Sequence, residues 1–285
     1  MIVDIHTHVF NPESDFGPKL QVDMKRCHVD QSVWGDVESR HLETTTAADV
    51  AIVFGLQASA TDWNIPNENV AAHVSRAPDR LLFFASIDPL KPGFMQELEK
   101  CHKHLGAVGV KLAPLYQNVH PADPRCYEIY RYCVKNGLPI LFHTGTSFVS
   151  GTPLDYSRPV HFDAVAVDFP DLKMVLAHLG HPWEGETISV IRRNANVYAD
   201  LSALYYRPWQ FYNSMRLLVE YHAEHKVLFG SDSPFTTTQS SLDGVRGVNT
   251  VIGKSGLPPI PGDVIENIIN RNSLELLGLP NPKLR

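Results

Sequence analysis

The sequence has no long apolar run, no basic cluster and few cysteines, and each absence narrows the class of protein. No stretch reaches the roughly 18 apolar residues that a membrane span requires, so we expect no membrane association. The 25 basic and 31 acidic residues are scattered and give a formal net charge of −6, which argues against nucleic acid as a partner. The first residues lack a basic segment followed by an apolar one, so we expect no signal peptide and a cytoplasmic protein.

The cysteine usage and the size of the chain suit a reduced globular protein. Cys27, Cys101, Cys126 and Cys133 form no C-x-x-C pair, and we expect mostly buried thiols. Of the 285 residues, 44% are hydrophobic and 20% charged, which fits one large domain or two small ones. A parallel α/β barrel often uses about 250 residues as a single domain.

Eight short apolar runs follow one another along the chain, separated mostly by segments with helical spacing. They are residues 1–10, 48–54, 81–87, 107–112, 139–143, 173–178, 196–201 and 226–232. Runs that do not alternate suit strands that are buried on both faces of a parallel sheet. Eight such units favour a closed (β/α)8 TIM barrel over an open sheet, so we predict a single α/β barrel domain over residues 1–285.

Helices are expected between these strands and after the last one. The segments with helical spacing are residues 67–77, 93–104, 124–136, 160–169, 188–194, 211–224 and 263–278. Gly137 stands in the position that ends a helix with a left-handed residue. Asp263 with Glu266 three residues later resembles a capping box at the start of the last helix.

Residues 11–46 form an insertion after the first strand that is polar and is predicted to be irregular. It is too long for a simple connection, and long insertions in compact domains are either functional lids or disordered. Arg26, His28, Trp34 and Arg40 could reach a ligand from it. The alternative for each of these residues is a solvated surface excursion.

Polar side chains gather at the C-terminal ends of the predicted strands. His6 and His8 alternate along the first strand and therefore share a face. Two imidazoles cannot complete a metal site, because zinc takes about four ligands. Other strand ends supply Lys111, His143, His178 and Asp232.

A lone histidine at such a position is more often structural, but six ionisable groups on one rim of a barrel are hard to explain that way. Barrels of this class keep their active sites at this rim. Burying the groups unpaired would be costly, whereas a bound cation satisfies imidazoles and carboxylate together. The pattern therefore predicts a metal site.

These motifs resemble the amidohydrolase superfamily, and within it the amidohydrolase-2 group, which includes aminocarboxymuconate-semialdehyde decarboxylase, the resorcylate-type decarboxylases and many predicted hydrolases. The resemblance rests on residues 4–8 (DIHTH), 109–112 (GVKL), 138–145 (LPILFHTG), 176–182 (LAHLGHP) and 229–234 (FGSDSP). It spans nearly the whole chain, and residues 11–46 match least.

The resemblance implies roles for the matching positions. His6, His8, His143 and Asp232 would bind one divalent metal, most simply zinc, with manganese as the alternative. His178 would lie beside the metal-bound water or the substrate as acid, base or orienting group. Asp232 would also act as the general base, since a metal lowers the pKa of bound water to about 7.

Lys111 leaves three interpretations open. A carboxylated lysine on the fourth strand bridges two metals in binuclear members of the superfamily, and His143 and His178 would then bind the second metal. A free ammonium could instead hold a substrate carboxylate, which we favour. The third interpretation is a structural lysine.

Loop residues after the strands would shape the pocket, although plain loop packing is an equal alternative for each. The candidates, by position only, are Phe10, Tyr116, Thr144, His181, Trp183, Tyr205 and Arg207. We single out His181 and Arg207 for substrate binding.

Three chemistries and one non-enzymatic function fit these residues. The first is hydrolysis of an ester, lactone or amide of a small carboxylated compound. The alternatives are non-oxidative decarboxylation of an aromatic or unsaturated acid, and hydration of a carbon–carbon double bond. His6 argues mildly against the resorcylate branch, which often has glutamate there. A metal-free binding module is the remaining alternative, and pairing as a homodimer is expected by analogy only.

Overall fold

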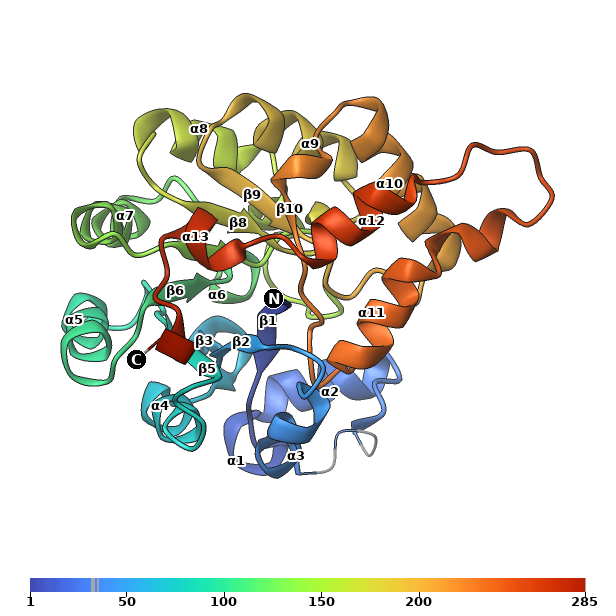
Figure 1. Ribbon diagram of the computed structural model, residues 1–285. Coiled ribbons are helices and arrows are strands. Elements are labelled where there is room, and N and C mark those ends of the chain that lie inside the picture. Colours follow the sequence, from blue (N-terminus) through green and yellow to red (C-terminus); the bar gives the residue numbers. More distant parts are fainter. Residues whose placement is uncertain (32–33, 35, 285) are drawn as a thin grey trace.

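Eight parallel strands form a barrel that is surrounded by helices in the computed structural model, which describes residues 1–31, 34 and 36–284 (Figure 1). In the order in which they are hydrogen-bonded, the strands are β1 (Val3–His8), β2 (Val50–Phe54), β5 (Leu81–Ser86), β6 (Gly109–Leu112), β7 (Ile140–Phe142), β8 (Met174–Leu176), β9 (Val197–Asp200) and β10 (Val227–Leu228). Each neighbouring pair is parallel. The predicted (β/α)8 architecture is confirmed.

The barrel closes between β1 and the segment that follows β10. Backbone N–H groups of Ile5 and His8 donate to Phe229 O at 3.1 Å and Ser233 O at 2.7 Å, and Asp232 N donates to His6 O at 2.8 Å. These bonds extend the pairing past the last residue of β10. The first and last strand ends are thereby held side by side.

Helices lie outside the barrel and mostly follow the predicted segments. Outside residues 11–46, the helices of at least eight residues are α4 (Asn67–Val74), α5 (Phe94–His104), α7 (Pro124–Asn136), α8 (His161–Asp168), α9 (Glu184–Arg193), α10 (Pro208–Glu220), α11 (Thr238–Arg246) and α12 (Gly262–Ile269). Gly137 ends α7 with a φ of 67°, as predicted. In the described part of the chain, no helix is both long and apolar enough to cross a membrane.

Residues 11–46 were wrongly predicted to be irregular. They contain α1 (Pro12–Asp15), α2 (Pro18–Arg26) and α3 (Val37–Thr44). Asn11 and Asp36 cap two of these helices with their side chains, and Leu20 and Met24 of α2 are fully buried. Short helices with few apolar residues give little periodicity, and burial against the barrel stabilises them instead.

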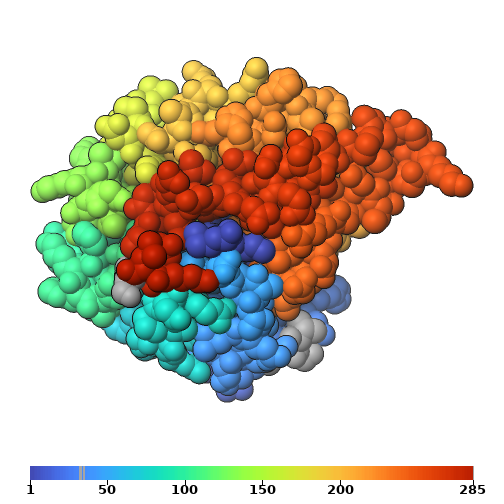
Figure 2. Space-filling view, in the orientation of Figure 1, coloured from blue at the N-terminus to red at the C-terminus, as the bar shows by residue number. Residues whose placement is uncertain are grey.

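The C-terminal segment also departs from the prediction. A single helix was expected over residues 263–278, but the chain forms α12 and, after a break, α13 (Ser273–Leu277). The predicted capping box is wrong, because Pro261 is the N-cap and no side chain caps α12. The C-terminal residues lie beside the N-terminus, where α13 packs near β1 (Figure 2). The sequence patterns also missed α6 (Pro114–Gln117), α11 and the small hairpin β3 (Gln57–Ala58) and β4 (Trp63–Asn64).

Alternation along the strands separates two hydrophobic clusters. On β6, Val110 and Leu112 pack outward against the helices, while Lys111 between them lines the barrel mouth. On β2, Phe54 belongs to the inner cluster and carries the Lys111 ammonium 4.6 Å from its ring centre. Parallel strands buried on both faces therefore place a charged residue of an apolar run inside the barrel.

Candidate active site

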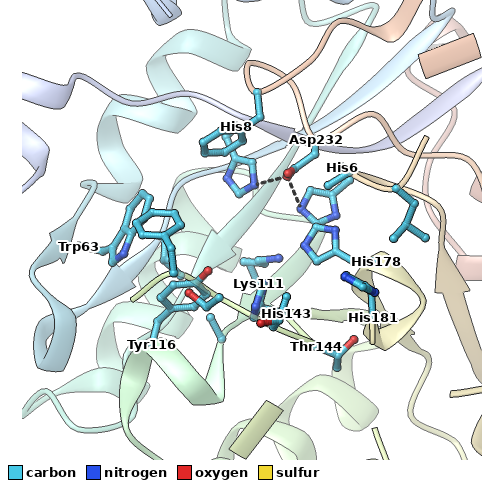
Figure 3. Close-up of a pocket in the computed structure, with 18 of the residues that line it drawn as sticks. His6, His8, Trp63, Lys111, Tyr116, His143, Thr144, His178, His181 and Asp232 are labelled. Atoms are coloured by element: carbon cyan, nitrogen blue, oxygen red, sulfur yellow. Dashed lines mark ion pairs between the residues drawn. The ribbon is translucent and has the colours of Figure 1, made fainter. Parts of the chain in front are cut away.

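A cavity of about 440 Å³ opens at the C-terminal ends of the strands (Figure 3). All six strand-end residues that the sequence singled out line it: His6, His8, Lys111, His143, His178 and Asp232. Aromatic and aliphatic side chains form much of the remaining wall, among them Phe10, Trp63, Tyr116, Phe148 and Phe235. A polar end and an apolar wall are typical of sites for small organic ligands.

Asp232 joins the two histidines of β1. Its Oδ1 lies 3.2 Å from His6 Nε2 and 3.3 Å from His8 Nε2, as the dashed lines in Figure 3 mark. Asp232 has a φ of 67°, and His178 has a φ of 58°. Non-glycine residues in this left-handed region cost roughly 1 kcal/mol or more and cluster at functional sites.

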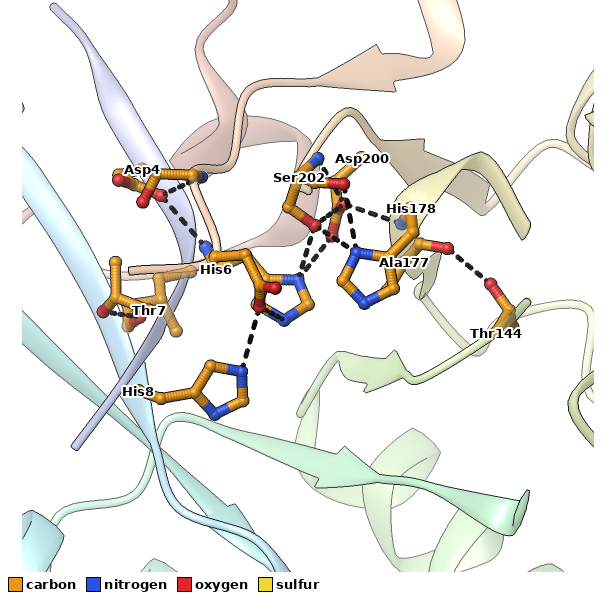
Figure 4. Close-up of polar contacts among 12 residues, drawn as sticks. Asp4, His6, Thr7, His8, Thr144, Ala177, His178, Asp200 and Ser202 are labelled. Atoms are coloured by element: carbon orange, nitrogen blue, oxygen red, sulfur yellow. Dashed lines mark hydrogen bonds and ion pairs between the residues drawn. The ribbon is translucent and has the colours of Figure 1, made fainter. Parts of the chain in front are cut away.

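Asp200 and Ser202 support two of these imidazoles from behind, and the sequence analysis did not identify them (Figure 4). Asp200 Oδ2 lies 2.9 Å from His6 Nδ1, and Oδ1 accepts the backbone N–H of His178 at 2.9 Å. Ser202 Oγ lies 2.8 Å from His178 Nδ1. The signal was present, because Asp200 closes an apolar strand as Asp232 does.

Burial and neighbouring groups keep the Asp200 and Asp232 carboxylates ionised and the His6 and His143 imidazoles neutral. Burial alone would raise the pKa of Asp232, but its contacts with His8 and His6 hold it well below its usual value. Burial lowers the pKa of His6 to about 3, and it lowers the pKa of His143 well below the usual value. Metal ligands must be in these deprotonated states.

Two buried imidazole nitrogens of the cavity have no hydrogen-bond partner among the described residues. They are Nε2 of His143 and, apart from its 3.2 Å ion-pair contact with Asp232, Nε2 of His6. The ring of His143 packs against Tyr116 at 4.7 Å and against His178 at 5.2 Å between centroids. Buried polar atoms without partners are rare in folded proteins, and a bound ion or ligand is one explanation.

The donor set fits a divalent cation. His6, His178 and Asp232 each offer one ligand atom, and these atoms lie within 4.8 Å of one another. His8 touches the same Asp232 oxygen, while His143 lies in the adjoining wall and is not part of this group of three. Imidazole and carboxylate ligands suit zinc or manganese.

Lys111 is a buried cation with no hydrogen bond or ion pair to any described residue. It is 2% exposed, and its Nζ lies 4.6 Å from the centre of the Phe54 ring. Burial lowers the pKa of Lys111 to about 7, while the charges of Asp200 and Asp232 act in the opposite direction. An incoming anion would favour the protonated form of this amine and would pair with it.

The remaining candidates divide into lining and non-lining residues. His181 and Arg207 line the cavity; Glu184 Oε1 lies 3.1 Å from His181 Nδ1, and exposed Arg207 stacks on Tyr206 at 4.5 Å. Phe10, Tyr116 and Thr144 also line it, whereas Trp183, Tyr205, Arg26, His28, Trp34 and Arg40 are not among the described lining residues. Trp34 instead packs on Phe10 and Phe235, so the 11–46 insertion supports the cavity wall.

The family can now be assigned by comparison. A sequence model described as amidohydrolase matches residues 3–279. The chain belongs to the amidohydrolase family. It is 23% identical over 355 aligned positions to 2-amino-3-carboxymuconate-6-semialdehyde decarboxylase of Dictyostelium discoideum, covering 99% of this chain and 93% of the relative.

Solved structures share the fold of this amidohydrolase at low sequence identity. An uncharacterised TIM-barrel protein of Bordetella bronchiseptica is 24% identical with a TM-score of 0.73, covering 100% of this chain and 99% of the other. A probable 2-pyrone-4,6-dicarboxylic acid hydrolase of Acinetobacter baumannii with citric acid bound is 18% identical with a TM-score of 0.64. The match covers 98% of this chain and 99% of the other. A dihydroxybenzoic acid decarboxylase of Polaromonas sp. JS666 with bound manganese and 2-nitroresorcinol is 16% identical with a TM-score of 0.63. The match covers 97% of this chain and 96% of the other.

Proposed function

We propose that this amidohydrolase is a divalent-metal-dependent decarboxylase of a small aromatic or unsaturated carboxylic acid. The observation that carries the proposal is Lys111, a buried ammonium without an anionic partner in a cavity with aromatic walls. A carboxylate of the substrate would supply the missing charge. The decarboxylases among the similar proteins support this chemistry over the hydrolysis that the motifs alone put first.

The proposed ion is zinc or manganese, held by His6, His8, His143 and Asp232. The unpartnered Nε2 atom of His143 and the contacts of Asp232 with His6 and His8 support this set. When bound, such an ion supplies positive charge that orients substrate oxygens and stabilises negative charge. Lys111 would remain a free cation rather than a carboxylated bridge between two ions.

The side chains of the cavity divide the remaining work. Lys111 Nζ pairs with the substrate carboxylate, and the aromatic wall formed by Phe10, Trp63 and Tyr116 holds the apolar body. Arg207 and His181 lie where they would contact substituents of the substrate near the cavity mouth. Orienting the substrate in this way lowers the entropic part of the barrier.

Decarboxylation needs one proton at carbon. The bond between the carboxylate carbon and the adjacent sp² carbon breaks, CO2 leaves, and the electron pair stays on the sp² carbon. His178 then delivers the proton to that carbon from Nε2, because its Nδ1 is held by Ser202. His178 regains a proton from water, so each turnover consumes one proton and releases one CO2.

Hydrolysis is the second candidate function. It is favoured by the ionised Asp232 carboxylate beside the imidazoles, which suits a base that takes a proton from water. The likeness in fold to a probable pyrone-dicarboxylic acid hydrolase agrees with it. The substrate would then be an ester, lactone or amide that also carries a carboxylate for Lys111.

A substrate panel separates the two chemistries. Protein loaded with Zn2+ or Mn2+ is assayed against hydroxybenzoates, unsaturated dicarboxylic acids, lactones and aryl esters, and both CO2 and acid release are measured. Decarboxylation predicts one CO2 per product that is shorter by one carboxyl group. Acid release without CO2 would replace the proposal by hydrolysis, and His6→Ala is the matched inactive control.

A further inference from the structure

Asp200 makes four contacts at the back of the cavity, one with the His6 ring, one with the backbone of His178 and two with Ser202. The carboxylate is fully buried at the end of β9. Its Oδ2 lies 2.9 Å from His6 Nδ1. Its Oδ1 accepts backbone N–H groups of His178 at 2.9 Å and Ser202 at 3.0 Å, and it also accepts the hydroxyl of Ser202 (Figure 4).

The donors and acceptors of this cluster fix the positions of its protons. An ionised carboxylate can only accept hydrogen bonds, so the Ser202 hydroxyl donates its single hydrogen bond to Asp200. The serine oxygen then faces His178 Nδ1 at 2.8 Å and His6 Nδ1 at 3.1 Å as an acceptor. The carbonyl oxygen of Ser202, 3.1 Å from His178 Nδ1, can only accept as well. Both Nδ1 atoms therefore have acceptors alone around them.

We infer that Asp200, with Ser202 as its bridge, is a positioning residue that keeps a proton on Nδ1 of both His6 and His178 and thereby directs both Nε2 atoms into the cavity. The inference deepens the proposed function and rests on it for its consequence. His6 Nε2 then carries no proton and presents its lone pair 3.2 Å from Asp232 Oδ1. A cation bound by both atoms would satisfy these two acceptors. His178 Nε2 is left as the ring nitrogen that exchanges a proton with the substrate.

Asp200 thus couples two functions through one carboxylate. It orients one imidazole by direct contact and the other through a hydroxyl and a backbone N–H. Because His178 has a left-handed backbone, its peptide N–H points at Asp200 and helps to keep that conformation. Loss of the carboxylate would let the His6 ring move its proton to Nε2, where it would block the binding of a metal ion.

Histidine ring NMR tests the proton positions directly. The 15N-labelled protein is measured by long-range 1H–15N correlation with and without Zn2+, and His6 and His178 are assigned from the His6→Asn and His178→Asn variants. We expect a proton on Nδ1 of both rings in both samples. An Nδ1 without a proton in either ring would overturn the inference.

Metal affinity tests the consequence. Asp200→Asn keeps the shape but offers an amide N–H that can donate to His6 Nδ1, so we expect the dissociation constant for Mn2+ to rise about 10- to 100-fold. Asp88→Asn is the matched control, because Asp88 is buried and accepts three hydrogen bonds from Ser59 and Leu90. Folded Asp200→Asn protein that binds Mn2+ as tightly as Asp88→Asn would overturn the inference.

A substitute variant and a measurement on the metal-free protein cover the cases in which the main experiment fails. If Asp200→Asn does not fold, Ser202→Ala replaces it and should weaken Mn2+ binding several-fold, since it removes the hydroxyl oxygen 3.1 Å from His6 Nδ1 but leaves Asp200 in place. Unchanged affinity and ring signals would contradict the inference. If the wild-type protein binds neither Mn2+ nor Zn2+, the proposed function fails. The proton positions in the metal-free protein would still decide the role of Asp200.

Discussion

Oδ1 of Asp232 lies 3.2 Å from Nε2 of His6, although the two residues come from opposite ends of the chain. The backbone N–H of Asp232 also donates to the carbonyl oxygen of His6 at 2.8 Å. The contact that closes the barrel therefore also assembles the candidate active site. A substitution that opened this seam would remove the site together with the fold, so side-chain changes that keep the backbone bond are the informative ones.

Asp232→Asn should lower turnover by at least about 100-fold while much of the metal remains bound. The amide keeps one oxygen for the ion but loses the charge that general base catalysis and charge balance need. Turnover and metal content by elemental analysis are measured on the same sample, with Asp88→Asn as the control. Undiminished turnover would exclude Asp232 from the chemistry.

His143→Ala and His178→Ala should separate a ligand from a proton donor. If His143 binds the ion through its unpartnered Nε2, its removal lowers the metal content of the purified protein, whereas His178→Ala keeps the metal and loses activity. The opposite pattern would assign the third ligand to His178, whose donor atom lies within 4.8 Å of those of His6 and Asp232. Both variants truncate a histidine of the same cavity, so each serves as the control for the other.

The barrel could be predicted because its strands are continuous apolar runs that end in polar residues. His6, Lys111, His143, His178 and Asp232 all stand at such ends, and the structure brings them to one cavity. Asp200 also stands at the end of an apolar run, but it belongs to none of the motifs that carry the family resemblance, so the sequence did not single it out. Its role depends on distances to His6 and His178 that only the folded chain has.

The insertion after β1 could not be predicted by the same reasoning. Its helices α1, α2 and α3 are short, and periodicity over one or two turns is weak. Trp34 was considered as a residue that reaches a ligand, yet it packs at 3% exposure behind Phe10 and Phe235. Tertiary burial, rather than local pattern, decides such segments.

Lys111→Met should raise KM for a carboxylate substrate about tenfold or more and should leave the metal bound. Methionine matches the apolar stem but removes the charge, so the substrate carboxylate would lose its partner. Because a buried unpaired ammonium is unfavourable, the thermal stability of the variant should equal or exceed that of the wild type. KM for the acid is compared with the inhibition constant of its methyl ester or amide, which lack the charge. Loss of metal instead would indicate the carboxylated bridge, and unchanged KM and metal content would show a bystander.

Two buried histidines behind β1 should make stability depend on pH. His73 Nε2 lies 3.0 Å from His41 Nδ1, and His41 Nε2 lies 2.9 Å from Thr7 Oγ1, between the two histidines of β1. The Thr7 hydroxyl donates to Ile52 O at 2.7 Å, so it accepts from His41, which in turn accepts from His73. Burial lowers the pKa of His41 to about 3 and that of His73 to about 4.

The direction of the pH dependence of stability is set by which state, folded or unfolded, binds more protons. Between about pH 6.5 and 4 the unfolded chain binds a proton at His73 and the folded chain does not, so stability falls as pH falls through this window. Burial raises the pKa of Asp4 to about 6, which acts in the opposite direction, so the difference between two proteins is the measurement that isolates His73. His73→Asn can still donate to His41 but does not titrate. The stability advantage of the wild type over this variant should shrink by roughly 1 kcal/mol for each pH unit below 6.5 in urea unfolding. A constant difference from pH 8 to pH 4.5 would show that His73 is not held neutral by the fold.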